Sequence, residues 1–138
     1  MICPICRNIM LLSVKSKPVT GTPADLQTGA DLADTLSAHS AECVGMAANM
    51  IGISKRIIAV SVGSVPLVMY NPVITAKADA YETEESCLSL SGTRKTTRYR
   101  SITVRWQDAA MQPQTRRFTG WLAQIIQHET NHLDGIII

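Results

Sequence analysis

Two histidines, His128 and His132, lie four residues apart near the end of the chain, in the stretch Q-H-E-T-N-H-L-D-G. On an α-helix this spacing places both imidazoles on one face, where they can bind one metal ion. Apolar residues recur at helical spacing, which predicts a helix that begins near Thr119 and ends at Gly135. The alternative is a chance pair at a solvated helix end, but the flanking positions are apolar. Two histidines alone rarely make a tight site, so a further ligand is expected.

A catalytic metal site needs three protein ligands and one open position, and cysteines and carboxylates are the candidates for the third ligand. Asp134 is only two residues beyond His132, on the wrong side of the helix. Cys87, in E-E-S-C-L-S, is expected between strands, from where it can reach across from the sheet; the alternative is a small buried hydrophobe. Glu129 lies beside the first histidine, where a carboxylate can take a proton from metal-bound water and pass it to a leaving amine.

The remaining pattern predicts an α+β fold in a single domain of residues 1–138. Thr22 can cap a helix whose first position is Pro23 and which should run to about His39. A tight turn of small residues is expected at 43–52. Further on, strands are predicted at residues 56–62, 66–70, 73–81, 101–108 and 114–118.

Composition excludes several kinds of partner. A net charge of +2 is too small to indicate a polyanion, so no specific nucleic-acid partner is expected. The apolar run Ile9–Leu12 is strand-like and too short for a membrane span or a signal peptide, so we expect no membrane partner and a cytoplasmic location. The four cysteines are then expected as reduced thiols or thiolate ligands.

The stretch C-P-I-C at Cys3 and Cys6 has a spacing that occurs in redox sites and zinc knuckles. A structural zinc would need two more ligands, and the chain has no second C-x-x-C. A redox pair normally opens a helix in a βαβ unit, which this pair does not. Both cysteines are therefore expected to be small packing or exposed residues.

Three stretches together resemble the motifs of the peptide deformylase family. They are C-V-G-M-A-A-N-M at 43–50, E-S-C-L-S at 85–89 and Q-H-E-T-N-H-L at 127–133. The family's patterns are approximately G-φ-G-φ-A-A-x-Q, E-G-C-L-S and Q-H-E-x-D-H, with φ apolar, in the same order. The resemblance extends through most of the chain. It implies the deformylase-like fold, with an N-terminal helix and mostly antiparallel strands packed around a C-terminal metal-binding helix.

The resemblance also implies that Cys87, His128 and His132 ligate one divalent metal ion and that Glu129 is the general acid/base. Iron(II) is implied as the ion in the cell, and zinc, nickel or cobalt can occupy the same site in purified protein. One thiolate with two imidazoles suits such ions, and the thiolate makes an iron form sensitive to oxygen. The implied reaction removes the N-formyl group from the formylmethionine of nascent polypeptides and releases formate.

The family stabilises the developing oxyanion with the backbone N–H that corresponds to Leu88 and with the glutamine that ends the first motif. That glutamine is replaced here by Met50, whose thioether donates no hydrogen bond. Losing one such donor predicts turnover lower by about 100- to 1,000-fold. Asn49 is not expected to replace it, because neighbours on a helical turn point about 100° apart. Two family glycines are also replaced, by Cys43 and Ser86, which predicts a narrower peptide groove.

A pocket for the substrate methionine side chain is implied as well, with Val44, Trp121 and Ile125 in its lining. Core packing is the alternative for the last two. Gln124 lies on the same helix face, where an apolar residue is expected. The predicted substrate-binding residues are Val44, Gly45, Met50, Ser86, Trp121 and Ile125.

Two other functions remain open. A deformylase-like protein weakened by Met50 could act as a metal-dependent binding module for peptide N-termini, although an intact Glu129 favours an enzyme. An H-E-x-x-H peptidase would cleave internal peptide bonds, but the three motifs together disfavour it. Basic residues at 94–100 could make a transient contact with the ribosome. A solvated strand face, with Arg98 paired to Glu85, is the more economical interpretation.

Overall fold

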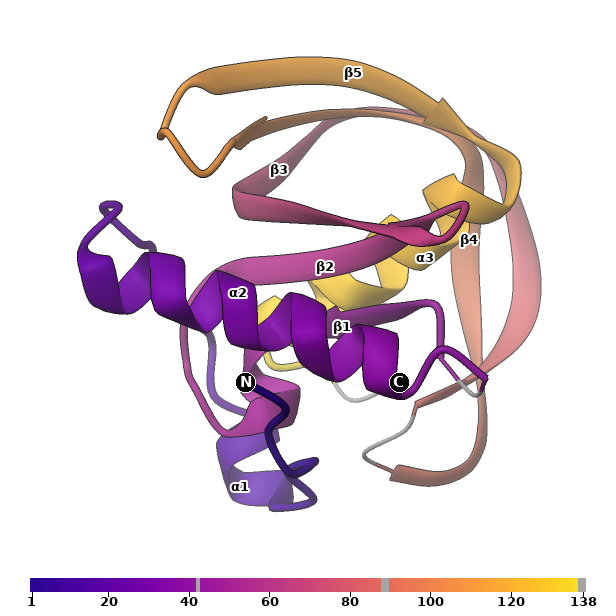
Figure 1. The fold of residues 1–138 in the computed structure, drawn as a ribbon. Helices are drawn as coiled ribbons and strands as arrows, with labels where there is room; N and C mark the ends of the chain where they lie inside the picture. Colours follow the sequence, from indigo (N-terminus) through magenta and orange to yellow (C-terminus); the bar gives the residue numbers. More distant parts are fainter. Residues whose placement is uncertain (42, 88–89, 137–138) are drawn as a thin grey trace.

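The computed structural model describes residues 1–41, 43–87 and 90–136, and the strands among them form one antiparallel sheet. Each strand pairs with the next along the chain, in the order β1-β2-β3-β4-β5 (Figure 1). The strands are β1 (Gly45–Ala47), β2 (Ile57–Val62), β3 (Val65–Cys87), β4 (Leu90–Gln107) and β5 (Pro113–Thr119). The helices are α1 (Ile9–Leu12), α2 (Pro23–Ala38), the 3₁₀ helix η1 (Ala48–Ile51) and α3 (Gly120–Leu133). The predicted α+β class is confirmed.

Helix α2 forms where its capping residues predict it. The Thr22 hydroxyl accepts the Asp25 N–H at 3.2 Å and the Asp25 carboxylate accepts the Thr22 N–H at 3.2 Å, which is a capping box, and Pro23 occupies the first turn. Leu32 and Leu36 on one face of the helix are fully buried. The helix predicted to run from Thr22 to about His39 is therefore confirmed.

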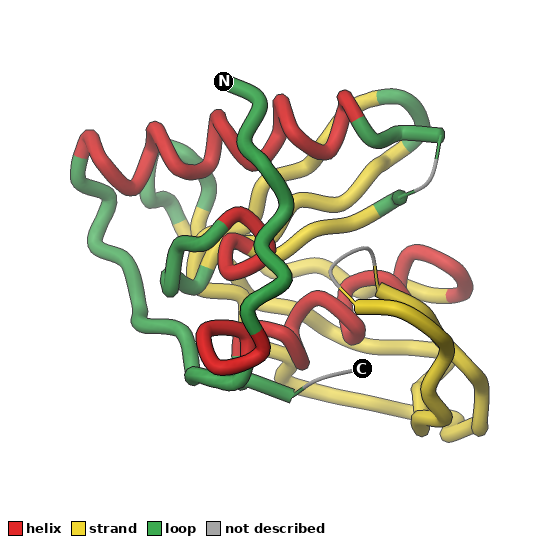
Figure 2. The backbone as a smooth tube through the Cα atoms, turned by 90° about the horizontal axis from the view of Figure 1, so that it is seen from below, coloured by secondary structure: helices red, strands yellow, loops and turns green. Residues whose placement is uncertain are grey.

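Strand β2 lies between two helices. Residues 57–60 are all buried, which requires both faces of the strand to be covered. Helix α2 covers one side and α3 the other, as both views show (Figures 1 and 2). The hydrophobic core thus fixes α3, which carries the two histidines, against the centre of the sheet.

The strands predicted at 66–70 and 73–81 are one continuous strand, β3. The sequence Asn-Pro bends this strand instead of ending it, because Asn71 takes a φ of 52° and the pairing with β4 shifts register between Tyr70 and Val73. The Asn71 amide group accepts the Val19 N–H and donates to the Val19 carbonyl oxygen, each at 2.8 Å. These two bonds stabilise the bend.

The outer half of the β3–β4 hairpin, residues 82–87 and 90–100, is absent from the prediction. It is rich in charged and hydroxyl side chains and lacks the apolar alternation that indicates a strand. The ladder ends at the pair Cys87–Leu90. Cys87 is therefore the last residue of β3, and its predicted place between strands is wrong.

Two short segments also differ from their predictions. Ile9–Leu12, expected to be strand-like, is helix α1, and the Asn8 side chain caps it by accepting the Met10 N–H at 3.0 Å. The small-residue turn expected at 43–52 contains strand β1 and helix η1. Of the helices in the described residues, none is long and apolar enough to cross a membrane.

Helix α3 begins and ends close to its predicted limits and lies inside the curve of the sheet (Figure 1). Gly135 follows it with a φ of 74°. A Cβ atom at this position would lie 2.3 Å from the Ser13 carbonyl oxygen, so only glycine fits between the two segments.

Candidate active site

The end of β3 and one face of α3 bring together Cys87, His128 and His132. Their ligand atoms all lie within 4.8 Å of one another, and all three residues are buried. The imidazole rings meet edge to face with centroids 4.5 Å apart. Asp134 is bonded elsewhere, to Arg56 at 2.9 Å, as its place on the helix predicts. The three residues form the metal-binding group that the sequence predicts.

Local structure explains this convergence. Glu85 and Cys87 are buried while Ser86 between them is exposed, so both buried side chains lie on the side of β3 that meets α3. Residues 128 and 132 are one turn apart on the buried side of α3. The metal-binding group therefore depends on the packing of the hairpin against α3 and not on a loop.

The electrostatics of the group suit a metal ion. Although burial raises the pKa of the Cys87 thiol, hydrogen bonding with the two histidines lowers it to about 6. Burial lowers the pKa of both imidazoles, but contacts with Cys87 and Glu85 raise that of His128 to about 9. Contacts with Glu129 and Cys87 raise that of His132 to about 10. The lowered pKa of Cys87 favours its thiolate form, which is the form that ligates a metal ion. One thiolate and two imidazoles are the donors that a borderline divalent ion prefers.

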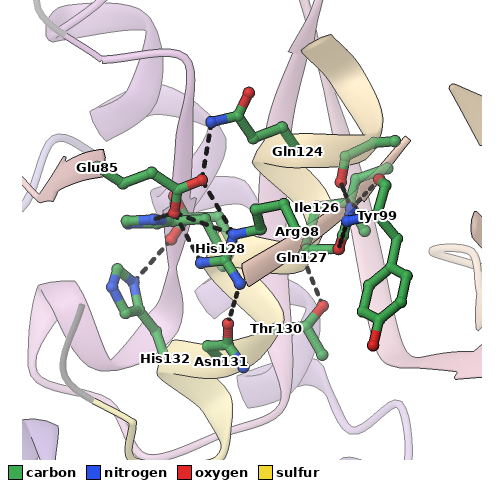
Figure 3. Close-up of polar contacts among 12 residues, drawn as sticks. Glu85, Arg98, Tyr99, Gln124, Ile126, Gln127, His128, Thr130, Asn131 and His132 are labelled. Atoms are coloured by element: carbon green, nitrogen blue, oxygen red, sulfur yellow. Dashed lines mark hydrogen bonds and ion pairs between the residues drawn. The ribbon is translucent and has the colours of Figure 1, made fainter. Parts of the chain in front are cut away.

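Glu85 and Arg98 support one of the imidazoles. Glu85 Oε1 lies 2.6 Å from His128 Nδ1 and accepts a bond from Arg98 Nη2 at 2.7 Å (Figure 3). Burial raises the pKa of Glu85, but its hydrogen bonds from His128, Arg98 and Gln124 lower it to about 2. The predicted pair of Arg98 with Glu85 is confirmed, but Arg98 is buried and does not lie on a solvated face as expected. Because His128 Nδ1 is occupied, its Nε2 is left for an ion.

Glu129 is buried beside the metal-binding group. Its Oε1 lies 2.9 Å from His132 Nδ1, and only 4% of the residue is exposed. Strand β1 approaches α3 closely at this point, since a Cβ atom on Gly45 would lie 2.5 Å from Ile125 Cγ2 and 3.1 Å from the Glu129 carboxylate. Gly45 therefore lets the backbone of β1 pass directly beside Glu129.

A cleft of about 710 Å³ opens beside these groups. Trp121 lies in its wall with 64% of its surface exposed, so core packing does not explain this residue, whereas Ile125 is 6% exposed and belongs to both cleft and core. Leu88, the predicted backbone donor, lies outside the described residues. Predicted site residues that line the cleft are Val44, Gly45, Met50, Ser86, Cys87, Trp121, Ile125, His128 and Glu129.

Residues 5–138 match the family described as polypeptide deformylase. The chain belongs to this family. A peptide deformylase of Clostridium beijerinckii is 50% identical over 138 residues, which cover 100% of both chains. A peptide deformylase structure from Thermotoga maritima matches with a TM-score of 0.89 and 28% identity over 99% of this chain and 95% of that chain. A peptide deformylase structure from Legionella pneumophila matches with a TM-score of 0.86 and 32% identity over 98% of this chain and 82% of that chain.

The deformylase fold and activity implied by the sequence motifs are therefore confirmed, and the enzyme is a metal-dependent hydrolase. The last two residues of the first motif, Asn49 and Met50, have defined contacts, and of these two Met50 departs from the family pattern. Met50 is 1% exposed, and its sulfur accepts the Ala47 N–H at 3.4 Å. Asn49 donates to the His132 carbonyl oxygen at 2.8 Å, so its amide nitrogen supports α3.

Three polar residues of the site make contacts that were not predicted from the sequence. Asn131, where the family pattern has aspartate, accepts a bond from Arg98 Nη1 at 2.5 Å. Gln127 binds the Tyr99 N–H and carbonyl oxygen, each at 2.8 Å, and so joins α3 to β4. Gln124 donates to Glu85 at 2.8 Å (Figure 3). The sequence showed only that these residues are polar. Their partners lie in strands that are distant along the chain.

Cys3 and Cys6 do not join the metal-binding group formed by the described residues. Both are free, half-buried cysteines, and Cys3 packs against the core. Their backbones attach the N-terminal segment: the Cys3 N–H donates to Thr35 Oγ1 at 2.9 Å, and the Cys6 N–H donates to the Met50 carbonyl oxygen at 2.6 Å. These contacts agree with a packing role.

Proposed function

We propose that Cys87, His128 and His132 hold one divalent ion, iron(II) in the cell, and that zinc, nickel or cobalt can replace it in purified protein. The observation that carries this proposal is one cysteine sulfur and two imidazoles within 4.8 Å, beside a buried carboxyl group at a cleft. When bound, such an ion supplies Lewis acidity, which polarises a carbonyl group and lowers the pKa of water.

Glu129 is the general acid/base of the proposed reaction. Its carboxylate accepts a proton from the attacking water and delivers it to the amine nitrogen as the formyl C–N bond breaks. Water is thereby divided between formate and a free amino terminus. The burial of Glu129 beside the three ligands places its carboxylate next to the reacting atoms and limits access of bulk water.

The oxyanion that develops during attack requires hydrogen-bond donors as well as the ion. We assign one donor to the backbone N–H of Leu88. Met50 occupies the position of the second donor and cannot supply a hydrogen bond, and Asn49 is already bonded to α3. Reduced turnover relative to a site with both donors is the proposed consequence.

The substrate is proposed to be the formylmethionyl terminus of a nascent polypeptide. Val44, Trp121 and Ile125 form an apolar part of the cleft wall, which suits a methionine side chain. Gly45 and Ser86 line the cleft on β1 and β3, where an extended peptide could lie between the two strands.

Residues 1–138 are proposed to act as one catalytic domain in the cytoplasm, where nascent chains are made. A transient ribosome contact is a further proposal, and it rests on Lys95 and Arg100, which are exposed on β4. Arg98 cannot contribute to such a contact, because it is buried against Glu85.

Met50 favours a second candidate function, a weakened deformylase that binds peptide N-termini through its metal. For the other alternative, a peptidase that cleaves internal peptide bonds, the described residues add no support beyond the H-E-x-x-H motif. A binding module would hold formyl-Met peptides without releasing formate, and a peptidase would cut peptides that carry no formyl group.

Formate release from a formyl-Met tripeptide tests the proposal. The protein is purified without oxygen, loaded with iron(II) or nickel, and compared with the Glu129→Ala variant. Release by the wild type and a loss of at least about 100-fold in the variant are expected. Metal bound at one ion per chain without formate release would favour the binding module.

A further inference from the structure

Gln124 is a polar residue on α3, about one turn before His128, at a position where the sequence predicts an apolar side chain. Its amide has two partners in the structure. Nε2 donates to Glu85 Oε2 at 2.8 Å, and Oε1 accepts the Tyr81 hydroxyl at 3.3 Å. The Tyr81 bond sets which end of the amide faces Glu85, so that the donor and not the acceptor meets the carboxylate.

The two oxygens of Glu85 are not equally held by the other residues. Oε1 receives Arg98 Nη2 at 2.7 Å and lies 2.6 Å from His128 Nδ1. Arg98 Nε is 3.0 Å from both Oε1 and Oε2, so this bond is shared between them. Among the residues that the structure describes, Gln124 is the one undivided donor to Oε2.

The terminal torsion of a glutamate side chain is soft, so hydrogen bonds determine the orientation of its carboxylate plane. A rotation about this bond would carry Oε1 away from His128 Nδ1. Gln124 opposes that rotation at the opposite oxygen (Figure 3). The orientation of the His128 ring therefore depends on a contact on the far side of Glu85.

We propose that Gln124 is a positioning residue that acts through Glu85 to orient the metal ligand His128, and that Tyr81 orients Gln124. This inference rests on the proposed metal site. It extends that site to a residue in the wall of the cleft, because Gln124 lies in the cleft lining beside Trp121 and Ile125.

Cobalt binding by the full chain tests this inference without relying on turnover. Gln124→Met keeps the length of the side chain and removes the donor. Partners of metal ligands affect affinity by about 10- to 100-fold, and Gln124 is one contact further out, so cobalt affinity should fall by roughly tenfold. The visible absorption of bound cobalt should also change, since it reports ligand geometry. Chelator competition gives the affinity.

Two further variants separate the proposed role from a general loss of structure. Tyr81→Phe should weaken binding in the same direction but less, and the double variant should match Gln124→Met, because Tyr81 acts only through Gln124. Gln114→Met is the matched control, since the amide of Gln114 on β5 donates an exposed hydrogen bond to Asp108 at 3.1 Å. Its cobalt affinity should equal that of the wild type.

The outcomes distinguish this inference from the proposed function. If the wild type and Cys87→Ser bind cobalt alike, the metal site itself is wrong. If Cys87→Ser loses cobalt but Gln124→Met keeps wild-type affinity and absorption, Gln124 has no positioning role. If Gln124→Met fails to fold, Tyr81→Phe decides: unchanged affinity and absorption in that variant would overturn the inference.

Discussion

Met50 places a thioether where the family pattern has a hydrogen-bond donor, and the structure offers no rearrangement of Asn49 to replace it. The Asn49 amide nitrogen is held by the His132 carbonyl oxygen, and both residues are buried. At the scale of single residues, the site thus keeps its metal-binding group and Glu129, whereas Met50 supplies no hydrogen bond where the family pattern has a donor.

Replacing Met50 with glutamine should restore that contact. We expect turnover of a formyl-Met tripeptide to rise by about 100- to 1,000-fold, because a donor aimed at the oxyanion acts only as negative charge develops. Metal content should not change. Steady-state kinetics on the nickel-loaded protein measures the effect, with Met50→Leu as a control that supplies no donor. An unchanged rate in Met50→Gln would mean that another group already fills this role.

The sequence allowed the two histidines to be predicted because their spacing is a property of one helix. Cys87 needed the resemblance, since spacing along the chain does not reveal a contact between a strand and a helix. Gln124 was misjudged for the same reason: its partner Glu85 lies 39 residues away. Short-range periodicity identifies helix faces, whereas a network that joins two elements depends on tertiary packing.

At the scale of elements, the sequence predicted a helix or strand correctly where neighbouring residues determine it. The capping box and Pro23 locate α2 within about one residue. The outer part of the β3–β4 hairpin has no comparable signal, because its strands pair with each other while carrying polar side chains on an exposed ribbon. Its strands are stabilised by cross-strand pairing, which a sequence window cannot show.

The contact of α2 with β3 provides an element-scale prediction. Alanine favours a helix over glycine by about 1 kcal/mol, but a Cβ atom on Gly29 would lie 2.0 Å from the buried Tyr70 hydroxyl oxygen. The steric clash should dominate, and Gly29→Ala should lower the free energy of unfolding by about 1–3 kcal/mol.

Urea unfolding measures this change. Adding Tyr70→Phe to Gly29→Ala removes the closest atom and should recover part of the loss, with Tyr70→Phe alone as the control. A Gly29→Ala variant as stable as the wild type would show that α2 can move away from β3 at little cost.

At the scale of the whole molecule, metal binding and folding should be linked. The three ligands come from β3 and α3, so the complete group exists only in the folded state. An ion at 100 times its dissociation constant then adds about 2.7 kcal/mol to the apparent stability. We expect cobalt to raise the Tm of the wild type and a chelator to reverse the increase. An equal increase in Cys87→Ser would place the stabilising ion elsewhere.

A second property of the whole fold is its dependence on pH through Asp25, which joins the start of α2 to the segment before β2. Lys55 Nζ lies 2.6 Å from Asp25 Oδ1, and the Thr20 and Thr22 N–H groups donate to Oδ2 at 3.1 and 3.2 Å. The Lys55 contact is the main reason why the pKa of Asp25 lies below its usual value of 3.8. The backbone hydrogen bonds lower the pKa further, and burial opposes them.

Because the folded-state pKa is lower than the unfolded one, ionised Asp25 stabilises the fold fully above pH 3.8, and this contribution is lost as the pH falls through the folded-state value. The Asp25→Asn variant lacks this stabilising contribution at every pH. The difference in unfolding free energy between wild type and variant should therefore be constant from about pH 7 to pH 5 and should shrink below about pH 4. Urea unfolding across this pH range measures the difference in unfolding free energy, and Lys55→Met should show the same trend.

A difference that stays constant down to about pH 3 would mean that the ionised form of Asp25 is not what stabilises this junction.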